Sequence, residues 1–152
     1  MFNLYFPAVP RAGLVVTQTE PPRVLQPQPA PSTRVLLVED DTAVRTVLER
    51  GLRRSGLLVE AVDGGEAALA RLRSAVAPVI DVLVSDVMMP GIDGVELVDR
   101  VRAFRPDLGV VLMSGFAEPP LHRAADRQGV NFLAKPFATA DLVAAIARAS
   151  GA

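Results

Sequence analysis

Ionisable side chains occupy positions in this sequence where a buried strand should end. The stretch VLVSDVMMPGIDG places Asp86 directly after four residues that are typical of a buried strand. An acidic run at 39–41 (Glu-Asp-Asp) follows the apolar run RVLLV, and Lys135 follows the apolar run at 130–134. Ser114 ends a further run, GVVLMS. If these runs are parallel neighbours, carboxylates, a hydroxyl and an ammonium group meet at one edge of a sheet.

Such a group of side chains has a definite chemistry. Two like charges about 4 Å apart repel by roughly 4 kcal/mol at an effective dielectric constant near 20, so a cluster of carboxylates either takes up protons or recruits a cation. Magnesium suits oxygen ligands of this kind, whereas softer metals are disfavoured because the chain has no cysteine and its single histidine, His122, lies outside these strand ends. A lysine and a serine would bind anionic oxygens. Together these groups indicate a phosphoryl site with a carboxylate as nucleophile.

A structural role explains only some of the acids. Asp41 precedes TAVRTVL and Asp93 precedes GVELV, and both fit the N-cap position of a helix. Capping does not explain Glu39, Asp40 and Asp86 together, because Asp86 precedes a turn.

Apolar periodicity predicts five strand-helix units that would position these residues. The expected strands span 34–38, 57–62, 81–85, 109–114 and 130–134, and the expected helices span 41–56, 65–77, 94–104, about 120–128 and 138–150. This alternation indicates an α/β fold with a parallel sheet covered by helices on both faces. Doubly wound sheets of this kind bind their ligands beyond the carboxyl ends of the strands.

Composition narrows the class of protein further. The 152 residues are 50% apolar and 22% charged, which is typical of a globular domain, and the net charge of −1 gives no field that would attract nucleic acid or an anionic membrane. No stretch reaches the roughly 18 apolar residues that a membrane span needs. The absence of cysteine is compatible with the cytoplasm, which is the expected location.

The N-terminal part differs from the rest of the chain. Seven of the thirteen prolines fall within residues 7–31. We therefore predict an N-terminal segment at 1–16, a proline-rich linker at 17–33 and a folded domain at 34–152.

Four motifs together resemble the receiver domain of two-component response regulators. They are the Glu39-Asp40 pair, SDVMMPGIDG, the MSG segment at 113–115 and the AKPF segment at 134–137. The resemblance covers about residues 33–151. It implies a flavodoxin-like (βα)5 domain with strand order 2-1-3-4-5.

The resemblance also implies a role for each site residue. Asp86 would be the phosphoacceptor, and Ser114 and Lys135 would contact the phosphoryl group. Magnesium would be held directly by Asp40, by Asp86 and by the backbone carbonyl of Met88, while Glu39 would act from behind these ligands or through water. Ser114 and Phe132 would form the switch, and the Lys135-Pro136 bond would be cis.

The expected function is therefore that of a phosphoacceptor and not of an enzyme. Asp86 would take its phosphoryl group from a histidine kinase or a histidine phosphotransfer protein and change the surface of the fourth helix and fifth strand. A phosphohydrolase with an aspartyl nucleophile is the first alternative, but such enzymes typically carry a second aspartate where Met88 stands. A module that only binds partners is the second, and such modules normally lack one of the acids or the lysine.

The ends of the chain suggest two parent proteins. The segment MFNLYFPAV weakly resembles the last strand of a histidine kinase ATP-binding domain, which favours the C-terminal receiver of a hybrid sensor kinase. The alternative is a single-domain response regulator with an N-terminal tail.

Overall fold

Five parallel strands form the centre of the molecule. The structure is a computed structural model and describes residues 27–30, 32–115 and 129–151. Its sheet has the order β2-β1-β3-β4-β5, as the family resemblance predicted. In chain order the elements are β1 (Arg34–Val38), α1 (Thr42–Arg54), β2 (Leu58–Val62), α2 (Gly65–Arg73), β3 (Val82–Asp86), α3 (Gly94–Arg102), β4 (Gly109–Ser114), β5 (Asn131–Ala134) and α5 (Thr139–Ala149).

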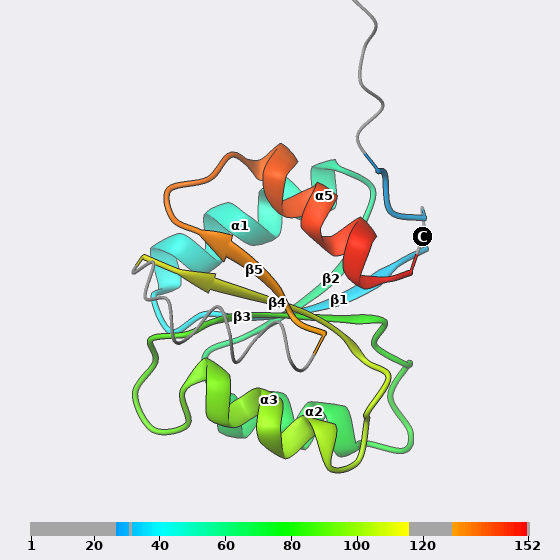
Figure 1. Cartoon of the computed structure of the whole chain (residues 1–152), viewed down its shortest axis with the longest axis vertical. Helices are drawn as coiled ribbons and strands as arrows, with labels where there is room; N and C mark the ends of the chain where they lie inside the picture. Colours follow the sequence, from blue (N-terminus) through cyan, green and yellow to red (C-terminus); the bar gives the residue numbers. More distant parts are fainter. Residues whose placement is uncertain (1–26, 31, 116–128, 152) are drawn as a thin grey trace, which may run out of the picture.

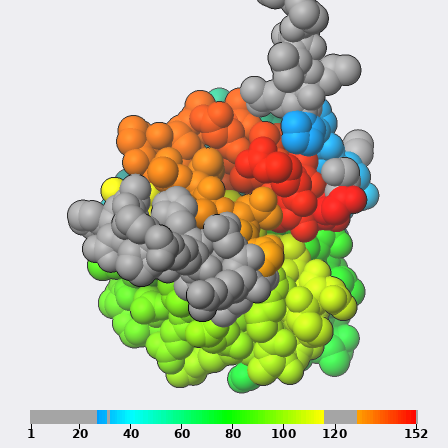
Figure 2. Space-filling model, in the orientation of Figure 1, coloured from blue at the N-terminus to red at the C-terminus, as the bar shows by residue number. Residues whose placement is uncertain are grey.

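Helices cover both faces of this sheet. Helices α1 and α5 lie on one face, and α2 and α3 lie on the other (Figure 1). The space-filling view shows α5 and the residues before it packed over one side, with the α2 and α3 half of the chain on the other (Figure 2). The sandwich has three layers, and no edge of β1 or β3 is left open.

Strand β1 shows why the sheet is buried on both faces. Leu36 and Val38 pack into the cluster under α2 and α3, whereas Val35 and Leu37 pack into the cluster under α1 and α5. All four side chains are fully buried. Alternate residues point to opposite faces of a strand, so a continuous apolar run is what a doubly covered strand requires.

The register of the central strands brings the predicted site residues to one edge. Strand β1 pairs with β3 from Val35 opposite Val82 to Val38 opposite Ser85, so β3 ends one residue beyond the end of β1. Asp86 is itself the last residue of β3 and lies opposite Met113 of β4. The charged residue therefore belongs to the strand and does not follow it.

Helix α2 is shorter than predicted. The expected helix reached residue 77, but α2 ends at Arg73, and Ser74 is already extended. The side chain of Val76 is 97% exposed, so a longer helix would bury no further apolar surface there. The residue before a proline also avoids the helical conformation, which excludes Ala77 from a helix that meets Pro78.

Several predictions concern residues beyond the described part of the chain. The N-terminal segment at 1–16, most of the linker at 17–33, the helix at about 120–128 and His122 lie outside the described residues. Among the helices that the structure does describe, none combines the length and apolarity needed to cross a membrane.

A partly buried ion pair holds α2 against β2. Arg71 donates to both carboxylate oxygens of Glu60, with Nη2 at 2.7 Å from Oε1, and also donates to the carbonyl of Pro78 at 2.8 Å. The hydrogen bond from Arg71 lowers the pKa of Glu60 below its ordinary value of 4.5, and the burial of the carboxylate only partly opposes this. Arg71 thus joins the end of α2 to the sheet and to the loop that leads into β3.

We expect Arg71→Gln to lower the free energy of unfolding by about 1 kcal/mol at pH 7, the size typical of a charged hydrogen bond that is partly exposed. Because the pKa of Glu60 is lowered in the folded protein, its contribution is present above pH 4.5 and is lost as the pH falls through the folded pKa. The difference between variant and wild type should therefore shrink in acid. Urea denaturation at several pH values measures it.

The matched control is Arg100→Gln, which removes an i,i+4 pair with Glu96 whose side chains are each 46% exposed. This variant should change stability by no more than a few tenths of a kcal/mol. An equal decrease in the free energy of unfolding in the two variants would show that the partly buried Arg71 contact stabilises the fold no more than an exposed ion pair does.

Candidate functional site

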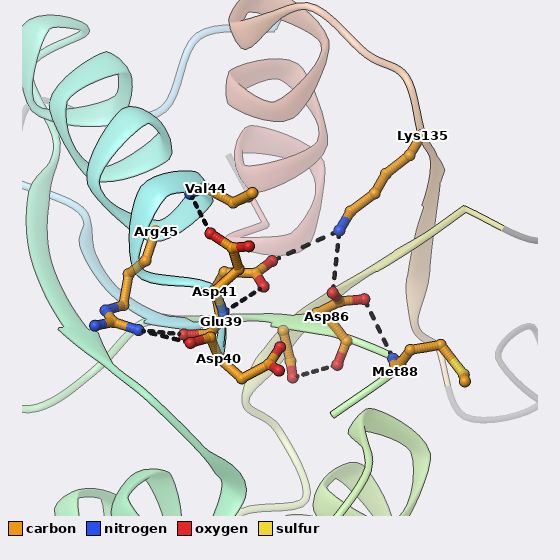
Figure 3. Close-up of polar contacts among 9 residues, drawn as sticks. Glu39, Asp40, Asp41, Val44, Arg45, Asp86, Met88 and Lys135 are labelled. Atoms are coloured by element: carbon orange, nitrogen blue, oxygen red, sulfur yellow. Dashed lines mark hydrogen bonds and ion pairs between the residues drawn. The ribbon is translucent and has the colours of Figure 1, made fainter. Parts of the chain in front are cut away.

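Three carboxylates converge where β1 and β3 end. Glu39 and Asp40 follow β1, and Asp86 closes β3. One carboxylate oxygen from each of the three lies within 4.8 Å of the others (Figure 3). Glu39 and Asp86 are buried, and Asp40 is exposed at the mouth of the cluster. The structure thus brings together the three acids that the sequence singled out.

The acidic loop is attached to both the sheet and α1. The amide of Glu39 donates to the carbonyl of Val62 at 3.2 Å, which extends the pairing of β1 with β2 by one residue. Asp41 accepts a hydrogen bond from the amide of Val44 at 3.0 Å and is the N-cap of α1, as predicted. The amide of Asp41 in turn donates to Oε1 of Glu39 at 3.2 Å. These contacts fix the backbone on either side of Asp40.

The loop after β3 holds Asp86 from the other side. The amide of Met88 donates to Oδ1 of Asp86 at 3.2 Å, and the amide of Val87 donates to the carbonyl of Met113 at 2.9 Å. The chain then returns so closely that a Cβ on Gly94 would overlap the carbonyl oxygen of Asp86 and lie 2.8 Å from the Cα of Val87. Only glycine fits there.

The predicted N-cap of α3 is also confirmed. Oδ1 of Asp93 accepts a hydrogen bond from the amide of Glu96 at 2.8 Å. This cap fixes the start of α3 directly after the loop that carries Met88.

Lys135 supplies the positive charge of the site. Its amide donates to the carbonyl of Ser114 at 2.8 Å, which places the residue just beyond the paired ends of β4 and β5. Its Nζ lies 3.0 Å from Oδ2 of Asp86 and 3.6 Å from Oε2 of Glu39. Burial alone would lower the pKa of Lys135, but the hydrogen bond to Asp86 and the charges of Asp86 and Glu39 outweigh burial and raise it. The lysine therefore stays positively charged to a higher pH than an isolated lysine does.

The remaining predicted residues lie around this centre. Ser114 is buried at the end of β4, and Phe132 on β5 packs in part against the α2 and α3 side of the core. The side chain of Met88 is 63% exposed. The peptide bond between Lys135 and Pro136 is cis, as the resemblance implied.

Charge is unbalanced within the cluster. Three carboxylates face one lysine. Burial raises the pKa of Glu39, and the charges of Asp86 and Asp40 add to this, although the hydrogen bond from Asp41 and the charge of Lys135 oppose it. Within the described residues, Oε2 of Glu39 is buried and receives no hydrogen bond. A buried carboxylate oxygen that has an ion pair with Lys135 at 3.6 Å but no hydrogen bond, beside two further carboxylates, fits the donor set of a hard divalent cation such as Mg²⁺.

One residue of the site was missed by sequence reasoning. Arg45, in the first turn of α1, donates from Nη1 to the carbonyl of Glu39 at 2.7 Å and to that of Asp40 at 3.4 Å. The sequence carried only a weak signal for this contact, because an arginine on a helix usually faces solvent.

Comparisons with known proteins show which family this chain resembles. A family model described as the response regulator receiver domain matches residues 35–147. The transcriptional regulatory protein PrrA of Mycobacterium tuberculosis is 44% identical over 117 residues, or 76% of this chain, and the response regulator receiver protein CpdR of Brucella abortus is 36% identical over 111 residues, or 72% of it. The matched region spans 48% of PrrA and 90% of CpdR, and 24% of the regulator NtrC of Salmonella typhimurium.

Solved structures agree on the fold. The receiver domain protein of Clostridium thermocellum superposes with a TM-score of 0.73 at 22% identity, covering 78% of this chain and 94% of that one. At this identity the likeness concerns the fold alone.

We expect Glu39→Gln to raise the free energy of unfolding by about 1 kcal/mol at pH 7 without divalent cations, because one like charge leaves the cluster. The pKa of Glu39 is raised in the folded protein, so its favourable contribution is complete below pH 4.5 and is lost as the pH rises through the folded pKa. The advantage of the variant should therefore vanish in acid. Saturating Mg²⁺ should stabilise the wild type more than the variant.

Urea denaturation with and without Mg²⁺ measures both effects. Glu66→Gln is the matched control, because it removes an exposed carboxylate from the first turn of α2. It should lower the free energy of unfolding by a few tenths of a kcal/mol both with and without Mg²⁺. A destabilised Glu39→Gln at pH 7 without cations would contradict the electrostatic description of the cluster.

Proposed function

The chain belongs to the response regulator receiver domain family of two-component systems, and from this membership we propose that Asp86 accepts a phosphoryl group from a phosphohistidine in a magnesium-dependent reaction. The donor would be a histidine kinase or a histidine phosphotransfer protein, and the cytoplasm would be the site of the exchange. The observation that carries the proposal is the hydrogen bond of 3.0 Å between Lys135 and Asp86 beside two further acids.

The chemistry follows from the contacts of Asp86. One carboxylate oxygen is held by the amide of Met88 and the other by Lys135, so the group is fixed for attack on phosphorus. The attack forms a bond from an Asp86 oxygen to phosphorus and breaks the bond from phosphorus to the imidazole nitrogen. The imidazole leaves as a neutral ring because its other nitrogen carries a proton taken from solvent. Lys135 neutralises charge on the transferring oxygens.

Magnesium fits the acids of this site. Asp40, Asp86 and the carbonyl of Met88 would hold the ion, and Glu39 would bind through water. When bound, the ion supplies positive charge that offsets the three carboxylates and the incoming phosphoryl oxygens.

A switch is proposed for Ser114 and Phe132. Phosphorylation adds up to about two negative charges next to Asp86, which favours a hydroxyl donor from the buried Ser114. Movement of Ser114 toward the phosphoryl group would leave space that the partly buried ring of Phe132 can enter. The surface of β5 and of the fourth helix expected at about 120–128 would then change.

The docking surface for the histidine-bearing partner is proposed on α1 and the loop after Lys135. Val44 and Val47 lie one turn apart on α1 with side chains 38% and 69% exposed. Exposed valines beside an acidic site suit the apolar surface of a partner helix.

Particular residues argue against the two alternative functions, a phosphohydrolase and a module that only binds partners. A phosphohydrolase would need an acid two residues after Asp86, where the chain has Met88, so we expect a phosphoacceptor that does not turn over as an enzyme. A module that only binds partners would not require Lys135 and the three acids to be gathered together, as they are here.

We further propose that the parent protein is a hybrid sensor kinase, on the strength of the segment MFNLYFPAV and the linker after it. The extensive match to CpdR supports the alternative of a single-domain regulator. The DNA upstream of Met1 decides between them: an open frame that encodes glycine-rich ATP-binding segments would support the hybrid kinase, and a stop codon in frame would overturn it.

The central test is labelling by acetyl phosphate or phosphoramidate. We expect the wild type to gain the mass of one phosphoryl group in the presence of Mg²⁺ and to stay unlabelled when EDTA is added first, because the acids need the cation to accept an anion. Asp86→Asn should take no label. In the labelled wild type, the NMR signals of the Phe132 ring should shift.

Asp107→Asn is the control, because it removes an exposed carboxylate in the loop before β4. It should be labelled as the wild type is. A label that persists in Asp86→Asn would overturn the site assignment, and unchanged Phe132 signals would overturn the switch alone.

A further inference from the structure

Arg45 ties α1 to the main chain of the acidic loop. Its Nη1 donates to the carbonyl of Glu39 at 2.7 Å and to that of Asp40 at 3.4 Å (Figure 3). Its Nη2 also donates to Oγ1 of Thr42 at 3.4 Å. The side chain is half-buried. A single guanidinium thus binds the carbonyl oxygens of two successive residues, both of which are acids of the cluster.

These two carbonyls lie in the short loop between the end of β1 and the start of α1. β1 ends at Val38, and α1 begins at Thr42 after its N-cap Asp41. The amide of Glu39 is still paired with Val62, and Asp41 is fixed by its cap, so the rotation of the Glu39-Asp40 peptide decides where the Asp40 carboxylate points. Arg45 is the described side chain that binds both of these carbonyls.

We propose that Arg45 is a positioning residue for the divalent cation site. By binding the carbonyls of Glu39 and Asp40 on the α1 side, it directs the two carboxylates toward Asp86. The inference rests on the proposed function, because that function supplies the cation. Among the described residues, Arg45 makes no hydrogen bond to any of the three carboxylate groups and binds backbone carbonyls and Thr42 instead.

Charge and position predict opposite effects of removing this residue. Arg45 is a cation near a site for a cation, so its charge alone opposes Mg²⁺ binding, and a neutral substitute should bind Mg²⁺ more tightly. If Arg45 instead orients the ligands, its loss should weaken binding in spite of the relieved repulsion. Removing a group that orients metal ligands typically lowers the affinity about tenfold or more.

The test uses Arg45→Met, Arg45→Lys and the wild type. Methionine keeps much of the length of the side chain without charge or donors, and lysine keeps the charge without the planar pair of donors. Titration with MgCl2 at constant ionic strength, followed through the amide NMR signals of Asp86 and Met88, gives the Kd of each protein. Urea denaturation of the same samples reports their stability.

Arg50→Met is the matched control. Arg50 is exposed on α1, and within the described chain its guanidinium makes no hydrogen bond or ion pair. It should leave the Kd of Mg²⁺ unchanged or slightly lower, since it removes the same charge without touching the acidic loop.

We expect Kd to rise about tenfold in both Arg45 variants, with folded spectra in each. A lower Kd in Arg45→Met with an unchanged Kd in Arg45→Lys would show that only charge matters and would overturn the inference. Unchanged Kd values with reduced stability would show a purely structural role and would also overturn it, while the proposed function would stand. A wild type that binds no Mg²⁺ would overturn both.

Discussion

The structure depends on keeping three like charges at one point. At a separation of 4.8 Å and an effective dielectric constant near 20, two carboxylates repel by about 3 kcal/mol, and Glu39, Asp40 and Asp86 all lie within that distance. A loop alone would relax by turning its side chains to water. Here Glu39 adjoins β1 and Asp86 ends β3, and the apolar residues of both strands are buried on both faces, so the backbones of these two acids cannot separate without pulling Val38 or Val84 out of the core. Burial of the apolar core thus offsets the repulsion among the three carboxylates.

The same constraint explains the polar contacts around the site. Lys135 offsets part of the charge, and the amides of Asp41 and Met88 each donate to a carboxylate. Gly94 lets the start of α3 approach the backbone of Asp86, which closes the loop that carries Met88. These contacts leave the acids oriented but incompletely neutralised. An incompletely neutralised cluster responds to the two species that a phosphoryl reaction brings, a divalent cation and an anionic phosphoryl group.

The sequence predicted the features that depend on local pattern. The strand that delivers Asp86, the caps formed by Asp41 and Asp93 and the alternation of strands and helices all follow from apolar periodicity and from residue type, while the strand order and the cis bond at Pro136 came from the family resemblance. What sequence reasoning missed depends on tertiary contacts. The early end of α2 reflects the lack of any surface for Val76 to cover, and the roles of Arg45 and Arg71 depend on which carbonyls and carboxylates the folded chain brings near them. The roles of Ser114 and Phe132 remain predictions, since they concern a phosphorylated state.

The central claim is that one cation and one phosphoryl group share the edge of the sheet formed by β1, β3 and β5. The most direct measurement is a crystal structure with Mg²⁺ and beryllofluoride, which mimics a phosphoryl group on a carboxylate. The account predicts density for beryllofluoride on an oxygen of Asp86, contacted by Lys135 and Ser114, and an octahedral ion bound to Asp40, Asp86 and the carbonyl of Met88. Beryllofluoride on another residue, or an ion that none of these carboxylates binds, would contradict it.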